Sequence, residues 1–383
     1  MMENCVFTIC AHNYMAQALT LQQSVLKYNK VDFKIFLADT PEESPLFEKL
    51  DESWIPNWRN MAFQYNITEF NTSIKPFCFN KLFEEGYKKV VYLDPDMFVV
   101  DSVNLIWDIL DNKSIILTPH FCDMRLKENQ EYREKEMLQD GICNLGFCAI
   151  SNNDVGREIV DWWKDRLTNQ CFNDKAEGLF TDQKWMMFIP ILFPDETCVS
   201  HNMGFNVAVW NLHERNLEIL NGKFYIRRLK DQSLTSLIFF HFSGFNPLHP
   251  MFLTRRKPNI NIDTYPSFRP ILEEYTDIIL ANNFAEYSKK KYGFAAFSNG
   301  EEVSVLQRRL YRKMLEQKFL SVAEDPFDSN GIVYNLFKKK RLLTKTMNIK
   351  GELTKESHGK THDMEHKYVY PCLKFLCRIL GEK

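Results

Sequence analysis

Short apolar runs alternate with amphipathic segments through the first 250 residues of the chain. Runs of consecutive apolar positions are typical of strands buried on both faces of a parallel sheet, and apolar residues at helical spacing indicate covering helices. The predicted strands span residues 5–10, 33–38, 90–93, 115–117, 146–150 and 238–242. The predicted helices span residues 16–28, 77–85 and 155–167. This alternation predicts an α/β fold with a mostly parallel sheet flanked by helices.

The pattern changes beyond about Pro250, where long amphipathic helices replace the strands. Residues 271–292 and 303–322 carry apolar side chains at helical spacing. Three regions are therefore predicted, and they have different characters. They are a catalytic domain at 1–250, a helical extension at 251–325, and a basic, partly flexible tail at 326–383 whose end fits an amphipathic helix.

Composition narrows the class of protein. Hydrophobic residues make up 45% of the chain, which excludes wholesale disorder. The net charge of −2 does not suggest a nucleic-acid partner. The ten cysteines form no C-x-x-C pair, so we expect reduced and mostly buried thiols in a cytoplasmic protein. No stretch approaches the roughly 20 apolar residues of a membrane span.

The tail combines basic and apolar residues, which allows two interpretations. Residues 338–341 are all basic, and residues 368–380 are apolar with interleaved cations. Such a tail fits peripheral contact with the anionic inner face of the plasma membrane, close to a lipid-linked acceptor. Alternatively, the terminal segment packs as a helix on the body of the protein.

The sharpest chemical signal is an acidic pair, Asp94 and Asp96, directly after the strand predicted at 90–93. Open α/β sheets bind ligands at the carboxyl ends of their strands. Two carboxylates held between apolar runs repel one another unless a cation lies between them. A hard divalent cation, Mn²⁺ or Mg²⁺, suits these ligands and can neutralise a leaving diphosphate. The alternative interpretation is a solvated acidic loop.

The run Tyr-Leu-Asp-Pro-Asp at 92–96 resembles the metal motif of the GT-A glycosyltransferases, and among them of glycosyltransferase family 8. That family includes glycogenin-like and bacterial lipooligosaccharide galactosyltransferase-like enzymes. The resemblance extends over residues 1–250 as an ordered series of short motifs. It implies a GT-A, Rossmann-like fold, here with a helical C-terminal appendage. It also implies metal-dependent, retaining transfer of a hexosyl group from a nucleoside-diphosphate sugar, with a UDP-sugar favoured, to a glycan or lipid-linked acceptor.

The resemblance also implies which residues hold the donor. The opening strand and helix are similar to the family segment whose loop binds the nucleoside. On this basis the nucleotide is expected to contact Thr8, Cys10, Asn13 and Tyr14. Lys75 stands in the helix before the acidic strand, where the family often has a lysine near the donor.

Three later motifs complete the implied site. Asn144 begins a segment that resembles the family's Asn-x-Gly strand beside the sugar. Asp182 and Gln183 resemble the pair that faces the donor sugar and the acceptor. The segment from His241 to Gly244 matches a His-Phe-x-Gly motif whose histidine completes the metal site.

The late motif departs from the family pattern after Gly244. The family continues to a Lys-Pro-Trp that grips the diphosphate, whereas here the next residues include no lysine. The phosphate charge would then need another partner, such as Lys75, Arg255 or Arg256. Without the resemblance, His241 on its apolar strand would more readily be a core residue than a ligand.

Several alternatives stay open from the sequence. Asp182 fits a general base for an inverting transfer, a group that orients the donor in a retaining transfer, or a helix N-cap. A nucleotidyltransferase would usually show a Gly-rich, basic loop after the first strand, and 11–14 contains neither Gly nor Lys. A non-catalytic sugar-nucleotide-binding module is the third reading. The polar and aromatic stretch at 201–211 fits an acceptor or donor loop, or a plain turn.

Overall fold

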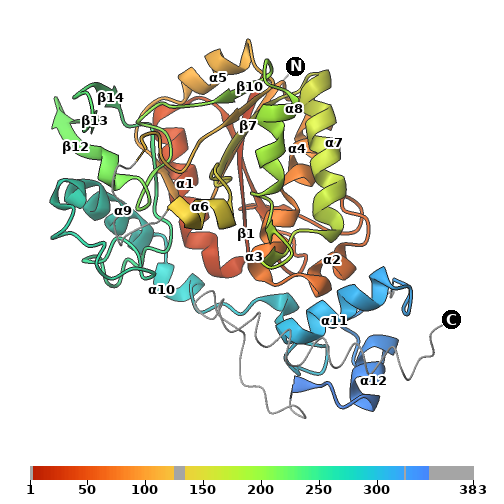
Figure 1. The fold of residues 1–383 in the computed structure, drawn as a ribbon. Helices are drawn as coiled ribbons and strands as arrows, with labels where there is room; N and C mark the ends of the chain where they lie inside the picture. The colour runs from red at the N-terminus through yellow and green to blue at the C-terminus, as the bar shows by residue number, and fades with distance from the viewer. Residues whose placement is uncertain (1–2, 125–133, 323–324, 345–383) are drawn as a thin grey trace. The chain divides into compact units, whose positions relative to one another are not determined.

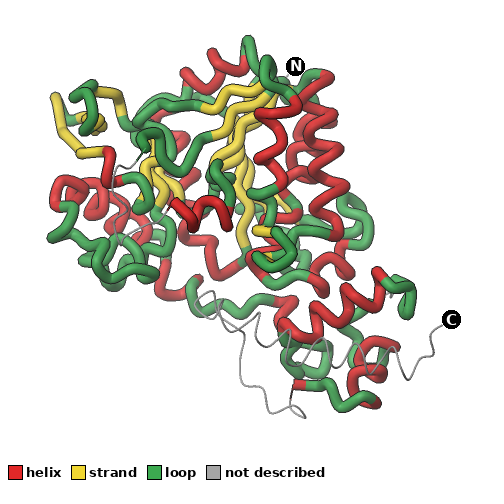
Figure 2. Tube along the Cα trace, in the orientation of Figure 1, coloured by secondary structure: helices red, strands yellow, loops and turns green. Residues whose placement is uncertain are grey.

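The computed structural model describes residues 3–124, 134–322 and 325–344. The predictions made for the end of the tail, beyond residue 344, therefore lie outside the described residues. The largest sheet has seven strands in the order β10-β6-β7-β4-β1-β2-β3 (Figures 1 and 2). These strands are β1 (Asn4–Cys10), β2 (Asp32–Leu37), β3 (Glu48–Lys49), β4 (Lys89–Leu93), β6 (Ile115–Leu117), β7 (Phe147–Ser151) and β10 (Thr197–Val199).

Most neighbours in this sheet run parallel, as the continuous apolar runs predict. β1 is parallel to β2 and to β4, β2 to β3, and β6 to β10. β7 alone runs antiparallel to both of its neighbours, β4 and β6. The predicted α/β class with a mostly parallel sheet is confirmed.

Helices cover both faces of this sheet (Figure 1). Val6 of β1 packs with Leu21 and Trp107 of the helices on one face. Its neighbour Phe7 points to the other face, where its ring contacts Phe79 edge-on at 4.9 Å between centroids. The alternation of side chains along a strand thus distributes one apolar run between two cores. The covering helices are α1 (Met15–Tyr28) and α5 (Asn104–Leu110) on one face, and α4 (Lys75–Glu84) and α7 (Asp154–Asn169) on the other.

A second, three-stranded sheet adjoins the point where β4 ends. Its order is β11-β15-β5, with β15 antiparallel to β5 and parallel to β11. β5 begins directly after the acidic turn, since the Met97 amide donates to the Asp94 carbonyl at 3.0 Å. The turn at 94–96 therefore lies at the junction of two sheets. The strands are β5 (Met97–Val99), β11 (Val207–Ala208) and β15 (Phe239–His241).

The other elements are short strands and peripheral helices. β12, β13 and β14 form an antiparallel meander, and β8 pairs with β9. The remaining strands are β8 (Asn173–Asp174), β9 (Leu179–Phe180), β12 (Arg215–Leu220), β13 (Lys223–Arg228) and β14 (Leu234–Ser236). Two further helices are α3 (Ile67–Ser73), which spans the division between the two units described below, and α6 (Glu134–Asp140). The others are α8 (Ile189–Leu192), α9 (Arg269–Ala281), α10 (Phe284–Tyr287) and the 3-10 turns η1 (His12–Tyr14), η2 (Trp185–Phe188), η3 (Leu212–Glu214) and η4 (Pro266–Phe268).

The chain divides into two compact units, and the division differs from the predicted boundary at residue 250. The first unit contains residues 1–50 and 71–290. Residues 251–290 belong to it because α9 packs on the small sheet, where Tyr275 stacks on Phe242 at 3.8 Å. After β15, every named element of the described chain is helical.

The second unit joins residues 51–70 to the described residues from 291 onward. Its described helices enclose aromatic side chains, and Phe63 contacts both Tyr311 and Phe327 at 4.9 Å between centroids. The buried guanidinium of Arg308 donates to backbone carbonyls, including that of Ala62 at 2.9 Å. The elements are α2 (Trp58–Gln64), η5 (Gly293–Ala295), α11 (Val305–Glu316) and α12 (Ile332–Lys339).

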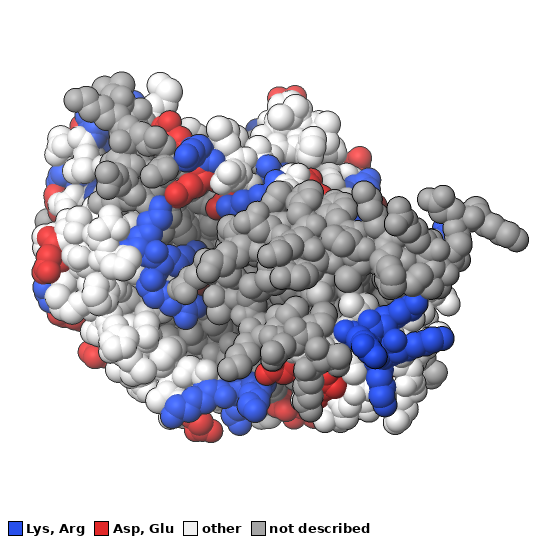
Figure 3. All heavy atoms as spheres, turned by 60° about the horizontal axis from the view of Figure 1, so that its bottom comes forward, with Lys and Arg blue, Asp and Glu red and all other residues white. Residues whose placement is uncertain are grey.

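The described residues also show how surface charge is distributed, whether the cysteines are paired, and whether any helix could span a membrane. Among the described residues visible in Figure 3, lysines and arginines form separate groups with acidic side chains beside them. All eight cysteines in the described ranges are free thiols, and six of them are buried. In the same ranges, no helix combines the length and the apolar character that crossing a bilayer requires.

Candidate active site

Two carboxylates and one imidazole converge at the junction of the two sheets. Ligand atoms of Asp94, Asp96 and His241 all lie within 4.8 Å of one another. The Nε2 atom of His241 is 3.1 Å from Asp96 Oδ1 and 3.7 Å from Asp94 Oδ2. The imidazole is only 4% exposed, whereas the carboxylates are 28% and 17% exposed, so the cluster opens toward solvent on its acidic side. Oxygen and imidazole ligands in this arrangement suit Mn²⁺ or Mg²⁺.

Strand register explains how residues far apart in sequence meet. β15 pairs with β5 so that His241 lies opposite Met97, the residue after Asp96. The amide of Phe242 donates to the carbonyl of Asp96 at 2.8 Å, which holds the two segments together. The structure thus brings the three predicted metal ligands to one place.

Gly146 provides the space in which the cluster forms. The Asp94 amide donates to the Gly146 carbonyl at 2.7 Å, so these two backbones are adjacent. A Cβ atom on Gly146 would lie 2.6 Å from His241 Cε1, 2.8 Å from Asp94 Oδ2 and 2.9 Å from Asn144 Oδ1. Only glycine fits at this position. The absent side chain leaves a cradle beside two ligands, and this observation favours a bound cation.

Gly146→Ala is expected to weaken Mn²⁺ binding by about 10–100-fold, the range seen when the support of a metal ligand is disturbed. The methyl group would displace both His241 and Asp94. Titration of free Mn²⁺ by electron paramagnetic resonance measures the loss. Gly86→Ala is the control for backbone strain away from the cluster, because the φ of +100° at Gly86 strains any side chain while nothing lies within 4 Å of the added carbon. Equal Mn²⁺ affinity in the two variants would contradict the assignment of this cradle.

Lys75 and Asp182 form a buried ion pair next to the cluster. Lys75 Nζ lies 2.8 Å from Asp182 Oδ2, 2.8 Å from the Leu145 carbonyl oxygen and 3.8 Å from Asp94 Oδ1. Burial would lower the pKa of Lys75, but Asp182 and Asp94 raise it above its ordinary value. Burial raises the pKa of the Asp182 carboxyl, and Lys75 opposes that rise. Asp182 caps no helix, since η2 begins after Lys184.

The side-chain amides of Gln183 and Asn144 are engaged with neighbouring groups. Gln183 accepts from the Leu145 amide at 3.2 Å and donates to the Asp140 carbonyl at 2.8 Å. Asn144 Oδ1 accepts from the Gly146 amide at 3.2 Å. Gln183 therefore links the end of α6 to the segment just before β7, and both residues lie beside Lys75 and Asp182.

The predicted nucleotide-binding residues lie at the carboxyl end of β1 and in η1. Thr8 and Cys10 are buried in β1. Among the described residues, Thr8 Oγ1 and Asn13 Oδ1 are buried without a hydrogen-bond partner. Buried polar atoms are usually paired, so these two atoms are candidates to bind a water molecule or a ligand. Tyr14 lies in η1 close to these groups.

Two arginines lie near Tyr14 and the acidic cluster. Burial raises the pKa of Tyr14, the carboxylate of Asp96 raises it further, and Arg255 and Arg256 lower it. The Arg255 amide donates to the Gly244 carbonyl at 2.9 Å. A Cβ on Gly244 would meet Arg256 Nε at 3.3 Å, and Gly244 has a φ of +74°. Both arginines are exposed, so their charges are accessible to an anionic ligand.

The sequence did not single out His120, and it placed Asn206 only within a polar stretch. Asn206 is buried and lies between His241 and Asn144, with contacts of 3.2 and 3.0 Å. His120 follows β6 and lies 3.4 Å from Asn144. Because ligand sites form at the carboxyl ends of strands, the position of His120 just after a strand was the available signal.

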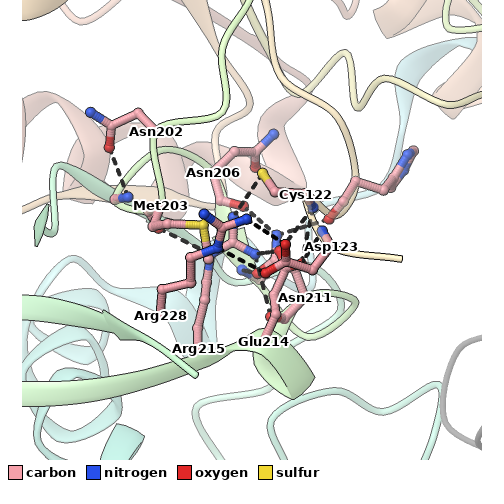
Figure 4. A network of polar contacts seen from close by, with 12 residues as sticks. Cys122, Asp123, Asn202, Met203, Asn206, Asn211, Glu214, Arg215 and Arg228 are labelled. Atoms are coloured by element: carbon pink, nitrogen blue, oxygen red, sulfur yellow. Dashed lines mark hydrogen bonds and ion pairs between the residues drawn. The ribbon is translucent and has the colours of Figure 1, made fainter. Parts of the chain in front are cut away.

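A polar network fixes the loop that carries Asn206 (Figure 4). The Arg215 guanidinium pairs with Glu214 and donates to the Met203 carbonyl at 3.0 Å. The Glu214 carboxylate also accepts from the amides of Cys122 and Asp123. Buried charges that are paired and hydrogen-bonded hold a loop rigidly. The stretch at 201–211 is therefore a fixed wall of the site.

Comparison with protein families and curated sequences gives two distant relatives. No family model matches the chain. The uncharacterised protein YfnF of Bacillus subtilis strain 168 is 28% identical over 182 residues, which cover 46% of this chain and 57% of YfnF. The uncharacterised protein YfnD of the same strain is 25% identical over 221 residues, 56% of this chain and 67% of YfnD. The match thus spans little more than half the length of YfnF.

Solved structures with a similar arrangement are glycosyltransferases. The galactosyltransferase LgtC, in complex with donor and acceptor sugar analogues, has a TM-score of 0.42 and 16% identity, covering 72% of this chain and 95% of LgtC. The glycosyltransferase GlyE of Streptococcus pneumoniae TIGR4 has a TM-score of 0.37 and 15% identity, covering 78% of this chain and 67% of GlyE. At these values the likeness does not by itself assign an activity.

Proposed function

We propose that this protein is a GT-A glycosyltransferase that moves a hexosyl group from a nucleoside-diphosphate sugar to a glycan or lipid-linked acceptor. One observation carries the proposal: Asp94, Asp96 and His241 converge within 4.8 Å at the carboxyl end of β4. The D-x-D motif at 94–96 and the late His-Phe-x-Gly motif at 241–244 were expected to meet on the resemblance to glycosyltransferase family 8, and their meeting is the support.

The three ligands would hold Mn²⁺ or Mg²⁺. When bound, such a cation neutralises the diphosphate that leaves with the nucleotide. Asp94 and Asp96 supply the negative charge, and His241 supplies a neutral nitrogen ligand from the second sheet. The protein's part is to hold these groups in place before the donor arrives, which removes a reorganisation cost from the reaction.

The surrounding residues support a nucleotide-sugar donor. Thr8 and Asn13 offer buried polar atoms without a partner among the described residues. Arg255 and Arg256 are exposed cations close to Tyr14, and they suit a diphosphate because guanidinium groups bind phosphate oxygens well. This pair would replace the lysine that the late motif lacks. A UDP-sugar is the donor that the resemblance favours.

Retention of the anomeric configuration is the stereochemistry we propose. A general base must reach the acceptor hydroxyl and be able to take its proton. The Asp182 carboxylate is 2% exposed and is paired with Lys75 at 2.8 Å. An ion-paired, buried carboxylate is poorly suited to that task, and it suits the holding of Lys75 beside Asp94 instead. This arrangement favours retention over inversion with Asp182 as base.

Peripheral membrane contact through the tail stays part of the proposal. It rests on the sequence of the basic and apolar segments at 338–341 and 368–380, most of which lies outside the described residues. A lipid-linked acceptor would make such contact useful.

The test is donor turnover by the full-length protein with a panel of UDP-, GDP- and CMP-hexoses, with Mn²⁺, with Mg²⁺ and after chelation. We expect cleavage of a UDP-hexose that requires the cation. Nuclear magnetic resonance of the released or transferred sugar is expected to show the anomer of the donor. Full activity after chelation would contradict the metal-dependent mechanism. An inverted anomer would contradict retention and restore Asp182 as the candidate base.

A further inference from the structure

Four polar side chains form a continuous hydrogen-bonded row that ends at the metal cluster. His120 Nδ1 lies 2.9 Å from the Ile142 carbonyl oxygen, and His120 Nε2 lies 3.4 Å from Asn144 Nδ2. Asn206 Nδ2 lies 3.0 Å from Asn144 Oδ1, and Asn206 Oδ1 lies 3.2 Å from His241 Nδ1. His120, Asn206 and His241 are each at most 5% exposed.

The direction of each bond follows from two backbone groups, whose roles are unambiguous. The Ile142 carbonyl only accepts, so His120 carries its proton on Nδ1. Burial lowers the pKa of His120 to about 4, and the ring is therefore neutral at physiological pH. Its Nε2 atom is then an acceptor, and the Asn144 amide nitrogen must donate to it.

The second backbone group confirms this orientation of Asn144. The Gly146 amide only donates, and it donates to Asn144 Oδ1 at 3.2 Å. Asn206 must therefore turn its amide nitrogen toward Asn144 Oδ1, and the same nitrogen donates to Thr118 Oγ1 at 2.9 Å. The carbonyl oxygen of Asn206 is left facing His241 Nδ1, which has to donate.

We propose that Asn206 is a positioning residue that fixes the proton of His241 on Nδ1 and so presents the lone pair of Nε2 to the cation. Nε2 faces the carboxylates, 3.1 Å from Asp96 Oδ1. Partners on the far ring nitrogen orient a ligating histidine and strengthen it as a ligand. The inference rests on the proposed function in one respect only, namely that the group bound by Nε2 is a metal cation.

Neighbouring groups also fix the backbone of Asn206. Its φ is +49°, a left-handed conformation that asparagine adopts more readily than most residues. Asn211 Nδ2 donates to the Asn206 carbonyl at 3.0 Å, within the network of Figure 4. The ring of Trp210 stands edge-on to both His120 and His241, at 5.4 and 5.1 Å between centroids. The row is thus fixed in position, and His120, Asn206 and His241 are buried.

Asn206→Gly removes the side chain without straining the backbone, because glycine accepts a positive φ. The variant therefore tests the contribution of the side chain alone. We expect this variant to fold and to bind Mn²⁺ about 10–100-fold more weakly than the wild type. Electron paramagnetic resonance of free Mn²⁺ measures the affinity. Long-range nitrogen–proton correlation spectra of the Mg²⁺-loaded protein, labelled with ¹⁵N-histidine, report which ring nitrogen carries the proton. The cation is needed because without it the Asp96 carboxylate, 3.1 Å from Nε2, would accept a proton from that nitrogen. The His241 signal is assigned by its loss in His241→Gln.

Two matched variants distinguish positioning from general damage to packing. Thr118→Val removes the other partner of the Asn206 amide but leaves the contact with His241 intact. It is expected to keep the proton on Nδ1 and to bind Mn²⁺ more tightly than Asn206→Gly does. Asn206→Asp keeps an oxygen acceptor for Nδ1–H and is expected to bind Mn²⁺ more tightly than Asn206→Gly does.

Two results would overturn the inference. One is a spectrum of the Mg²⁺-loaded wild type in which Nε2 of His241 carries a proton, and the other is a folded Asn206→Gly with wild-type Mn²⁺ affinity. A wild-type protein that binds no Mn²⁺ would instead contradict the proposed function. The affinity of the wild type and the difference between the wild type and Asn206→Gly are separate measurements, so the two failures can be told apart.

Discussion

Asp96→Asn is expected to lower donor turnover by about three powers of ten, which corresponds to about 4 kcal/mol at 1.36 kcal/mol per tenfold change. The substitution keeps the shape of the side chain but removes one of the two negative charges that would hold the cation. The rate falls because the negative charge of the departing diphosphate would no longer be neutralised. Asp94→Asn is expected to behave in the same way. His241→Ala should lose less, because water can occupy the place of a neutral ligand.

Initial rates at saturating Mn²⁺ and donor measure this effect, and circular dichroism checks that the variants fold. Asp101→Asn is the matched control, since Asp101 follows the same strand, β5, and its carboxylate accepts from Ser236 instead of joining the cluster. Its rate is expected to stay close to that of the wild type. Equal losses of rate in Asp96→Asn and Asp101→Asn would show that turnover depends on any carboxylate beside β5, which would contradict the assignment of the cluster.

Lys75→Met is expected to destabilise the protein by about 3–5 kcal/mol, the cost of leaving one partner of a buried ion pair alone. Both groups are 2–3% exposed, so the Asp182 carboxylate would have no access to water. Chemical denaturation measures the free energy of unfolding. Lys34→Met is the control, because Lys34 pairs with Glu85 while 21% exposed, and such pairs contribute about 0–1 kcal/mol.

The double variant Lys75→Met with Asp182→Asn should recover much of this stability, since it removes the unpaired charge. The deficit of Lys75→Met should also shrink as the pH falls. Burial raises the pKa of Asp182, so the folded state takes up the proton at a higher pH than the unfolded chain does. A raised pKa favours folding below the unfolded pKa and loses that contribution as the pH rises. A deficit that is independent of pH and of Asp182 would contradict this account.

The sequence predicts five of the seven strands of the large sheet, because their apolar runs are continuous. The short edge strands β3 and β10 were not predicted. The acidic pair is also predictable, since charge between two apolar runs is unusual. It was not evident that the second run, from Met97 onward, is a strand of another sheet. That fact explains why His241 meets Asp96, because the register of β15 against β5 depends on pairing across a large separation in sequence.

Residues that act through their neighbours were the ones the sequence could not identify. Gly146 matters because a methyl group there would clash with His241 and Asp94. Asn206 matters because its side chain lies between Asn144 and His241. Neither property has a local pattern. The grouping of 51–70 with the chain beyond 291 was likewise hidden, since contacts between distant segments leave no periodicity.

The position of the cluster between two sheets sets the order in which it can form on the ribosome. Asp94 and Asp96 emerge with β4 and β5, but β15 follows about 145 residues later, which at 5–20 residues per second takes about seven to thirty seconds. During that interval β5 lacks its neighbour β15, and Phe98 and Val99 have an unpaired edge. Nascent chains halted before Ile238 would therefore expose an apolar strand and lack the third ligand, so chaperone engagement and cation capture should both change when β15 is released.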